Sequence, residues 1–171
     1  MPQTIRLYPQ DDGGVMISDP SGKGVYLPQY RLRLWVKVGA EYTRRQAVLD
    51  TGSPTCIFSK QVWVPLHDRG EIEWLCHPPS ADISFASLPR TTFLFGTYPF
   101  RLGRVLIQPV DLETGSLSPL PLLVQCTEDE DDALAPLPRV FVLGLAGLLN
   151  GRTLMLSASS DGRDWQGTLS E

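Results

Sequence analysis

The chain has 171 residues, of which 42% are hydrophobic and 20% are charged, so it has the composition of a globular protein that can bury a core. Its net charge of −4 argues against a nucleic-acid partner held mainly through phosphate contacts. Fifteen glycines and fifteen prolines favour short strands joined by turns over long helices. The composition therefore predicts an all-β protein with at most one or two short helices.

A membrane partner is not indicated by the hydropathy of the sequence. Residues 1–14 lack the apolar core of a signal peptide. The longest apolar run, residues 140–149, is too short to cross a bilayer and contains two glycines. We therefore expect a cytoplasmic protein.

The cysteines predict neither a disulfide framework nor a zinc site. Cys56, Cys76 and Cys126 are odd in number and widely separated, with no Cys-x-x-Cys pair. Cys76 and His77 are adjacent and could be imagined as a nucleophile and its base. Neighbouring residues of a strand point to opposite faces, so this interpretation is disfavoured.

The first 29 residues are expected to be an extension that adds edge strands or lies across the domain. Turn signals occur at residues 11–14 and 19–22, with possible short strands at residues 5–8 and 15–18. The clearest strand of the sequence follows at Tyr30–Val38, where apolar residues alternate with Arg31, Arg33, Trp35 and Lys37. After a turn at residues 39–41, residues 43–49 return antiparallel and end at Asp50.

Further elements are predicted along the rest of the chain. Ser59 would begin a short helix that Pro65 stops, and the acidic run at residues 128–132 is interpreted as a solvated loop. Strands are expected at residues 91–95, 98–110, 120–126, 140–144 and 153–157. A short apolar helix is expected at residues 145–149, with Asn150–Gly151 as its stop signal.

One motif carries candidate chemistry, the sequence Asp50-Thr51-Gly52-Ser53 at the end of an apolar strand. A carboxylate at the edge of a core is costly unless it is partnered. Thr51 offers a hydroxyl, and Gly52 lets the backbone turn sharply without a Cβ. The alternative is an ordinary turn in which the aspartate bonds its own backbone.

This motif resembles the active-site turn of the retropepsin-like aspartic proteases, in which two identical chains each supply one aspartate. Two further features of that family follow in the same order, so the resemblance covers about residues 30–157. A hairpin around Phe95-Gly96-Thr97 is similar to the flap that closes over the substrate. The strand Val142-Leu143-Gly144, with the short helix after it, is similar to the strand that packs beside the catalytic turn, where a glycine permits close approach.

The sequence also departs from the retroviral pattern. Viral enzymes commonly place an acidic residue two positions after the turn glycine and an arginine directly after the second glycine, and the two form an ion pair. Pro54 and Leu145 occupy those places here, so both charges are missing together and neither is left unpaired. Gly96 is nearly alone at the tip of the predicted flap, where the viral flap carries several glycines, so a rigid structural hairpin stays an alternative.

The resemblance implies a homodimeric aspartic endopeptidase that cleaves polypeptides with no metal and no organic cofactor. It implies catalytic roles for Asp50, Thr51 and Gly52, and structural support from Leu143 and Gly144. Ser53 is expected to add a hydrogen bond to the Asp50 carboxylate. The residues expected to contact substrate are Ser53, Thr55, Phe95, Gly96, Thr97, Val140 and Val142.

Three segments follow from this interpretation: an extension (residues 1–29), a protease domain (residues 30–157) and a polar tail (residues 158–171). Two alternatives remain open, a non-catalytic peptide-binding or dimerisation module on the same fold and an unrelated all-β domain. Finding Asp50 well away from the strand that ends at Gly144, or with its side chain in open solvent, would make the protease interpretation wrong and leave only a generic β domain.

Overall fold

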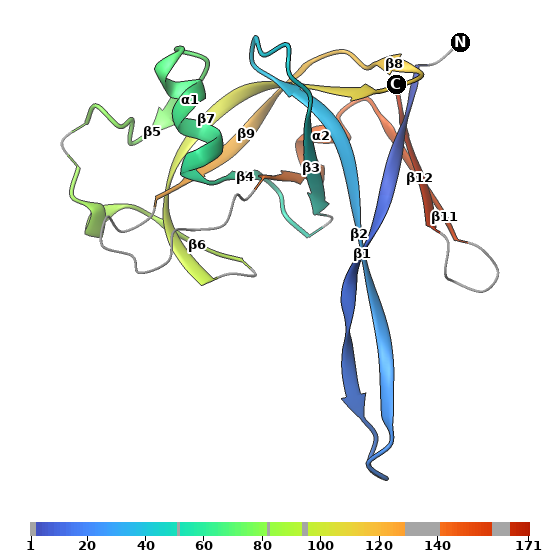
Figure 1. Cartoon of the computed structure of the whole chain (residues 1–171). Coiled ribbons are helices and arrows are strands. Elements are labelled where there is room, and N and C mark those ends of the chain that lie inside the picture. Colours follow the sequence, from blue (N-terminus) through green and yellow to red (C-terminus); the bar gives the residue numbers. More distant parts are fainter. Residues whose placement is uncertain (1–2, 51, 82, 94–95, 129–140, 159–164) are drawn as a thin grey trace.

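The computed structural model describes residues 3–50, 52–81, 83–93, 96–128, 141–158 and 165–171. These residues form mainly strands, with two short α-helices and one 3-10 turn (Figure 1), so the predicted all-β class is confirmed. The first half of the chain contains β1 (Thr4–Ser18), β2 (Gly24–Val38), β3 (Arg45–Asp50), β4 (Cys56–Phe58), α1 (Lys60–Asp68), β5 (Glu73–Cys76) and η1 (Phe85–Ser87). The second half contains β6 (Arg90–Phe93), β7 (Gly96–Asp111), β8 (Gly115–Ser116), β9 (Leu120–Thr127), β10 (Phe141–Gly144), α2 (Leu145–Leu148), β11 (Thr153–Ala158) and β12 (Trp165–Ser170).

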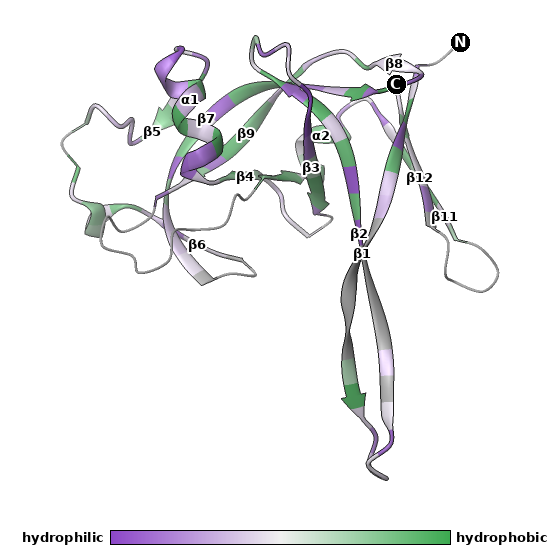
Figure 2. Ribbon diagram, in the orientation of Figure 1, coloured by the Kyte–Doolittle hydropathy of each residue, from purple (hydrophilic) through white to green (hydrophobic). Residues whose placement is uncertain are grey.

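The strands join into one strongly curved sheet in the order β11-β12-β1-β2-β3-β10-β4-β9-β7-β5. Strands β6 and β8 pair with β7, and β7 also pairs with β2. The curvature encloses a core built from almost every element, and Figure 2 shows apolar stretches along β7 and β9. Phe58 is fully buried there, and its ring meets Phe141 edge-on at a centroid distance of 4.8 Å.

The alternation predicted for Tyr30–Val38 is found in the second half of β2. Leu34, Val36 and Val38 are almost completely buried, whereas Arg33, Trp35 and Lys37 are partly exposed. Strand β2 turns at Gly39, whose φ is 59°, and β3 returns antiparallel with Leu32 opposite Leu49. The predicted delivery of Asp50 at the end of a buried strand is therefore confirmed.

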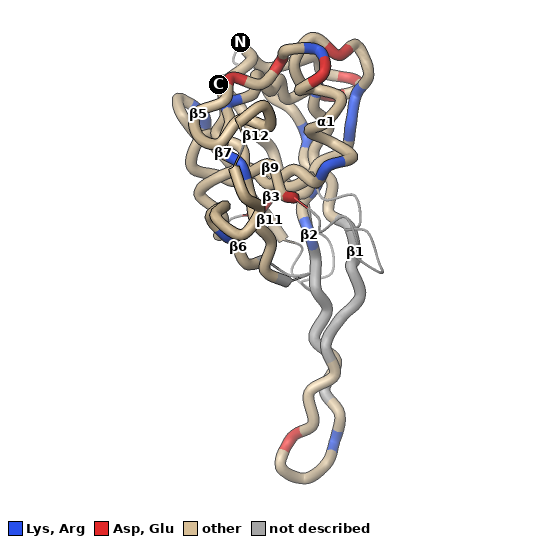
Figure 3. Tube along the Cα trace, turned by 90° about the vertical axis from the view of Figure 1, so that its left-hand side faces the viewer, with Lys and Arg blue, Asp and Glu red and all other residues tan. Residues whose placement is uncertain are grey.

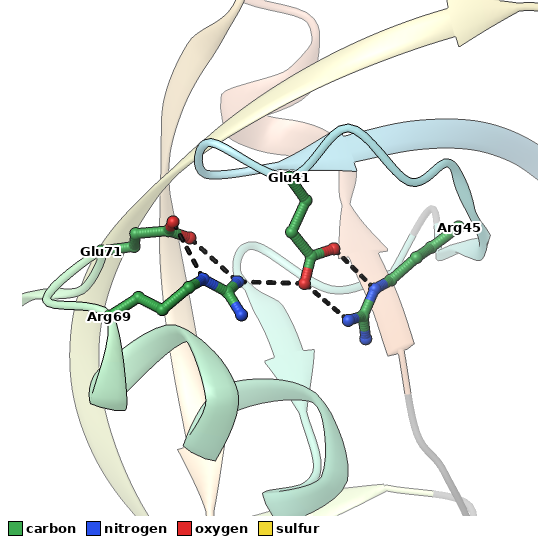
Figure 4. Close-up of polar contacts among 4 residues, drawn as sticks. All are labelled: Glu41, Arg45, Arg69 and Glu71. Atoms are coloured by element: carbon green, nitrogen blue, oxygen red, sulfur yellow. Dashed lines mark hydrogen bonds and ion pairs between the residues drawn. The ribbon is translucent and has the colours of Figure 1, made fainter.

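A network of charged side chains holds the turn after β2 against the end of α1 (Figure 4). Both Arg45 and Arg69 donate to the Glu41 carboxylate, and Arg69 also pairs with Glu71. The hydrogen bond from Arg69 holds the pKa of Glu71 below its ordinary value. Figure 3 shows that charged residues gather at this end of the molecule, opposite the projecting hairpin.

Helix α1 is longer than predicted, since Pro65 lies inside it and does not stop it. A proline in a helix interior removes one backbone hydrogen bond and costs about 3 kcal/mol. Val62, Trp63 and Leu66 are buried on one face of α1, and this burial offsets the loss. Ser59 occupies the N-cap position without a side-chain cap bond.

The two ends of the chain are parts of the sheet. Residues 165–170, predicted to belong to a polar tail, form β12, so that prediction is wrong for this strand. Strand β12 pairs with both β1 and β11, and Ile5, Leu7 and Leu169 belong to the core. The division of the chain at residues 29 and 157 stays a prediction, although β2 runs through residue 29 and β11 runs through residue 157.

Strands β1 and β2 continue far beyond the sheet as a projecting hairpin (Figure 1). The predicted turn at residues 19–22 is its tip, where Gly22 has a φ of 82° and Asp19 accepts backbone hydrogen bonds from Ser21 and Lys23. The predicted turn at residues 11–14 is wrong. The strand passes through it with a shift of register between Asp11 and Gly14.

Candidate active site

The candidate site is built on two parallel strands at the centre of the sheet. Strand β10 pairs with β3 in a register that places Val142 opposite Val48, Leu143 opposite Leu49 and Gly144 opposite Asp50. Its other edge pairs antiparallel with β4. Leu49 and Leu143 are both buried, so the end of β3 is held firmly although Asp50 itself lies at the surface.

Gly144 allows the loop after Asp50 to lie directly against β10. A Cβ at this position would lie 2.5 Å from the carbonyl oxygen of Thr55 and 2.7 Å from that of Ser53. Real Cβ atoms do not approach backbone atoms so closely, so any side chain would displace the loop. The predicted close approach of β10 to the turn is therefore present, with Leu143 buried beneath it.

The turn itself is held by bonds within residues 50–55. The Asp50 Oδ1 atom accepts a hydrogen bond from the Gly52 backbone N–H at 2.8 Å. Thr51 lies outside the described residues. The prediction that Ser53 bonds the Asp50 carboxylate is wrong, because its hydroxyl donates to the Thr55 carbonyl at 2.6 Å. Ser53 therefore stiffens the loop that Gly144 contacts.

Asp50 is exposed in the single chain. Asp50 lies beside Gly144, as the protease interpretation requires. Its exposure in the single chain counts against that interpretation unless a second copy covers the side chain. Among the described residues, the Asp50 carboxylate accepts the Gly52 N–H and forms no ion pair with a cationic side chain. A protease built on this site therefore requires the second copy to cover Asp50.

The predicted substrate contacts reach the neighbourhood of Asp50 by two routes: Ser53 and Thr55 follow it in the chain, and Val142 is the register partner of Val48. Ser53, Thr55 and Val142 are all partly buried. The Thr55 hydroxyl oxygen is buried and has no hydrogen-bond partner among the described residues, which costs free energy in a folded protein. Val140 lies outside the described residues.

The predicted flap is a hairpin in the structure, formed by β6 and β7. Its register runs from Arg90 opposite Pro99 to Phe93 opposite Gly96, and the Thr92 and Thr97 hydroxyls lie 2.8 Å apart. Phe95 lies outside the described residues. Figures 1 and 3 place this hairpin at the same level of the molecule as the end of β3. Its role as a lid stays a prediction.

A buried ion pair fixes the base of this hairpin, and the sequence analysis missed it. Glu128 is 7% exposed, and its carboxylate lies 2.5 Å from Arg101 and 3.2 Å from Lys60. Arg101 also donates to the carbonyl oxygens of His77 and Pro78. The interpretation of residues 128–132 as solvated is therefore wrong for Glu128, and residues 129–132 lie outside the described residues.

The cysteines are not arranged for nucleophilic catalysis. Burial raises the pKa of Cys56 to about 12 and raises the pKa of Cys126 even further, so both are inert thiols at neutral pH. Cys76 is exposed at the end of β5, and His77 leaves the strand with a φ of 56°.

Beside Gly144 lies a small cavity of about 170 Å³, lined mainly by apolar residues, among them Cys56, Leu122 and Ala146.

Among the residues that the structure describes, no three histidine, cysteine, aspartate or glutamate side chains gather as a metal site. In the same residues, no helix is long and apolar enough to cross a membrane.

Comparisons with known proteins give structural similarity but no sequence match. No protein-family model matches the sequence, and no curated protein matches it. Among solved structures, a retropepsin-like aspartic protease from Rickettsia conorii is similar over 99% of this chain and 94% of that chain. The two sequences are 11% identical, and the TM-score is 0.42. A similarity this distant carries no assignment of function, which has to rest on the geometry of the chain itself.

Proposed function

We propose that this chain is a retropepsin-like aspartic endopeptidase that acts as a homodimer. The observation that supports the proposal most directly is the parallel pairing of β3 with β10, which places Gly144 opposite Asp50. An ordinary Asp-Thr-Gly turn needs no glycine on a neighbouring strand. Here the missing Cβ is what lets the loop after Asp50 fit against β10.

The proposed chemistry requires two Asp50 carboxylates, one from each chain of a twofold dimer. Two carboxylates within hydrogen-bond distance cannot both ionise comfortably, so they hold one proton between them. The ionised carboxylate takes a proton from a water molecule, which attacks the scissile carbonyl carbon. The protonated carboxylate donates to the carbonyl oxygen and stabilises the tetrahedral intermediate.

The substrate is an extended polypeptide in this proposal. Extended peptides bind through their backbone groups, and alternate side chains enter pockets on either side. Ser53, Thr55 and Val142 would form the walls nearest to Asp50, since all three are only partly buried. Gly96 and Thr97 would contact the substrate from the β6–β7 hairpin, with Phe95 beside them in the sequence.

A non-catalytic module that dimerises or binds peptides is the second candidate. The exposure of Asp50 and its bond to Gly52 favour it, because both are also features of a plain turn. The two candidates differ in whether the Asp50 carboxylate has a chemical role.

The test is hydrolysis of an unfolded polypeptide over a range of pH by the purified chain and by Asp50→Asn. The amide keeps the size of the carboxylate and the bond from Gly52, so we expect folding and assembly to be retained while cleavage is lost. Asp68→Asn, which removes an exposed carboxylate at the end of α1, is the matched control and should cleave normally. Cleavage that persists in Asp50→Asn would exclude Asp50 from the reaction.

A further inference from the structure

The projecting hairpin is the largest feature that the proposed reaction leaves unexplained. Strand β1 pairs with β12 as far as Leu7, and β2 pairs with β3 from Leu32 onward. Within the described pairings, the segments between these points pair only with each other. We call residues 10–31 the arm. In Figures 1 and 3 it extends away from the rest of the molecule on the side where β3 ends.

Both faces of the arm are apolar and open near its tip. Met16 lies opposite Tyr26, and their side chains are 64% and 52% exposed. Ile17 follows Met16 in the strand and therefore lies on the other face, where it is 49% exposed. Figure 2 shows the apolar end of β1 within this otherwise polar tip.

Such a ribbon is not expected to stand alone in water. An isolated pair of strands is marginally stable at best, and stability comes from packing one face against something else. Clustered apolar side chains on a surface mark a contact with another molecule. The described residues of the chain supply no strand partner for the arm beyond its own two strands, so we look for a partner in another molecule.

The position of the arm relative to Asp50 identifies that partner as a second copy of the chain. The last pair of β2 with β3 is Leu32 with Leu49, so the arm begins at the residue beside the strand position of Asp50. Neighbouring strands lie about 4.8 Å apart. A twofold axis that brings two Asp50 carboxylates together therefore passes close to the start of both arms.

The dimensions of the arm fit this partner. At about 3.3 Å per residue, the paired segments extend roughly 30 Å, and two strands make a ribbon roughly 10 Å wide. Each face then covers roughly 300 Å². In a twofold dimer each chain would contribute one arm and receive another, so the arms would bury roughly 600 Å² per chain, against about 800 Å² in a typical stable interface.

We propose that the arm of each chain docks on the other copy and holds the two Asp50 turns together. This inference rests on the proposed function, because the pairing of the Asp50 carboxylates is what places the twofold axis. The arm is then the element that completes the site. Without it each chain keeps its fold and its Asp50 turn but lacks the second carboxylate.

The test compares two exposed tyrosines. Tyr26→Asp places a charge on the apolar face of the arm, whereas Tyr42→Asp places the same charge on a residue that is 94% exposed at the opposite end of β2. Sedimentation equilibrium of both variants in the Asp50→Asn background measures dimerisation without proteolysis. We expect Tyr26→Asp to weaken the dimer at least tenfold and Tyr42→Asp to leave it unchanged. Equal dimer affinities in the two variants would overturn the proposal.

A shortened chain provides the second variant. Replacing residues 11–30 with Asn-Gly joins Gln10 to Arg31, which are register partners, through a two-residue hairpin turn. This variant should be monomeric, and its circular dichroism spectrum should still be typical of a protein made mainly of strands. In the intact chain, backbone amides of residues 14–18 and 24–27 should exchange more slowly as protein concentration rises. Exchange that is independent of concentration would contradict docking.

The outcomes separate this inference from the proposed protease. If dimerisation depends on the arm but the protein cleaves no polypeptide, docking of the arm is supported and the proposed protease activity is wrong. If the shortened chain still dimerises and cleaves polypeptide, the protease activity is supported and the proposed docking of the arm is wrong. If Tyr26→Asp raises the KM for polypeptide but leaves the dimer intact, the arm belongs to substrate binding and the proposal is wrong.

Discussion

The two halves of β2 show how the same kind of strand behaves in two environments. From Leu32 to Val38 the strand lies between β3 and β7 and delivers three fully buried side chains to the core. From Gly24 to Arg31 it has β1 as its sheet neighbour, and Tyr26 is half exposed. The inner half is fixed by its own chain, whereas the outer half belongs to the arm, which we propose is completed by a second copy.

The largest expected effect comes from removing a core side chain in the inner half. Leu34 is fully buried, so Leu34→Ala should lower the free energy of unfolding by about 2–5 kcal/mol. Tyr26→Ala in the outer half should change it by no more than about 0.5 kcal/mol. Urea denaturation, at a concentration where both variants are monomeric, measures the difference. Equal losses in the two variants would mean that the arm packs on its own domain.

The second effect concerns the contact between β10 and the Asp50 loop. Gly144→Ala forces backbone atoms apart, and overpacking of this kind costs about 1–3 kcal/mol. Gly147→Ala is the control, because its Cβ would meet the end of the Leu122 side chain at 2.8 Å, which can rotate away. Thermal unfolding should show a clearly lower melting temperature for Gly144→Ala and little change for Gly147→Ala. An unchanged melting temperature for Gly144→Ala would show that β10 and the Asp50 loop are less tightly packed than in this structure.

The third prediction concerns the loss of stability in acid. The group responsible is the buried carboxylate of Asp111, which joins the end of β7 to the start of β1. Burial alone would raise the pKa of Asp111, but backbone N–H groups of Glu113, Arg6 and Thr114 donate to its carboxylate and bring the pKa below its ordinary value. The unfolded chain therefore binds this proton more readily. Its stabilising contribution is complete above about pH 4 and disappears as the pH falls through the lowered pKa.

Asp111→Asn tests this directly by urea denaturation between pH 2 and pH 7. The variant should lose about 1–2 kcal/mol at neutral pH, and its stability should fall less steeply than that of the parent below pH 4. If the free energy of unfolding falls equally steeply below pH 4 in both proteins, Asp111 does not contribute to the pH dependence.

The smallest expected effect is at the charged network behind the β2–β3 turn. Glu41 lies between the guanidinium groups of Arg45 and Arg69, so Glu41→Gln should cost about 0.5–1 kcal/mol at low salt. The loss should shrink as salt is added. Glu113→Gln, which removes a carboxylate that is 68% exposed and pairs with Arg6, is the control and should show no measurable loss. A loss that is independent of salt would point to packing instead of charge.

The sequence predicts the centre of this molecule well because two local signals agree there. Alternation of apolar residues marks the inner half of β2, and the glycine at position 144 indicates close backbone approach. Both follow from backbone geometry, which a short stretch of sequence determines. The same reasoning predicts the β6–β7 hairpin, β9 and the short helix α2.

Three of the misses have a shared physical cause, because each depends on contacts with distant parts of the chain. Pro65 is tolerated because tertiary burial offsets its local cost. Glu128 is buried because Arg101, 27 residues away, reaches its carboxylate. The Asp11–Gly14 stretch reads as a turn, but pairing with β2 carries the strand through it as a change of register. Strand β12 was detectable, since Trp165, Gly167 and Leu169 alternate with polar residues.

The unequal burial of the three cysteines makes Cys76 a natural labelling position. Burial keeps the thiols of Cys56 and Cys126 protonated and inaccessible, whereas Cys76 is exposed. A fluorescent maleimide should therefore attach at Cys76 without any engineering of the chain. Since Cys76 is the register partner of Leu102 in β7, the strand that also forms one side of the β6–β7 hairpin, a dye there would report movement of the hairpin when polypeptide is added.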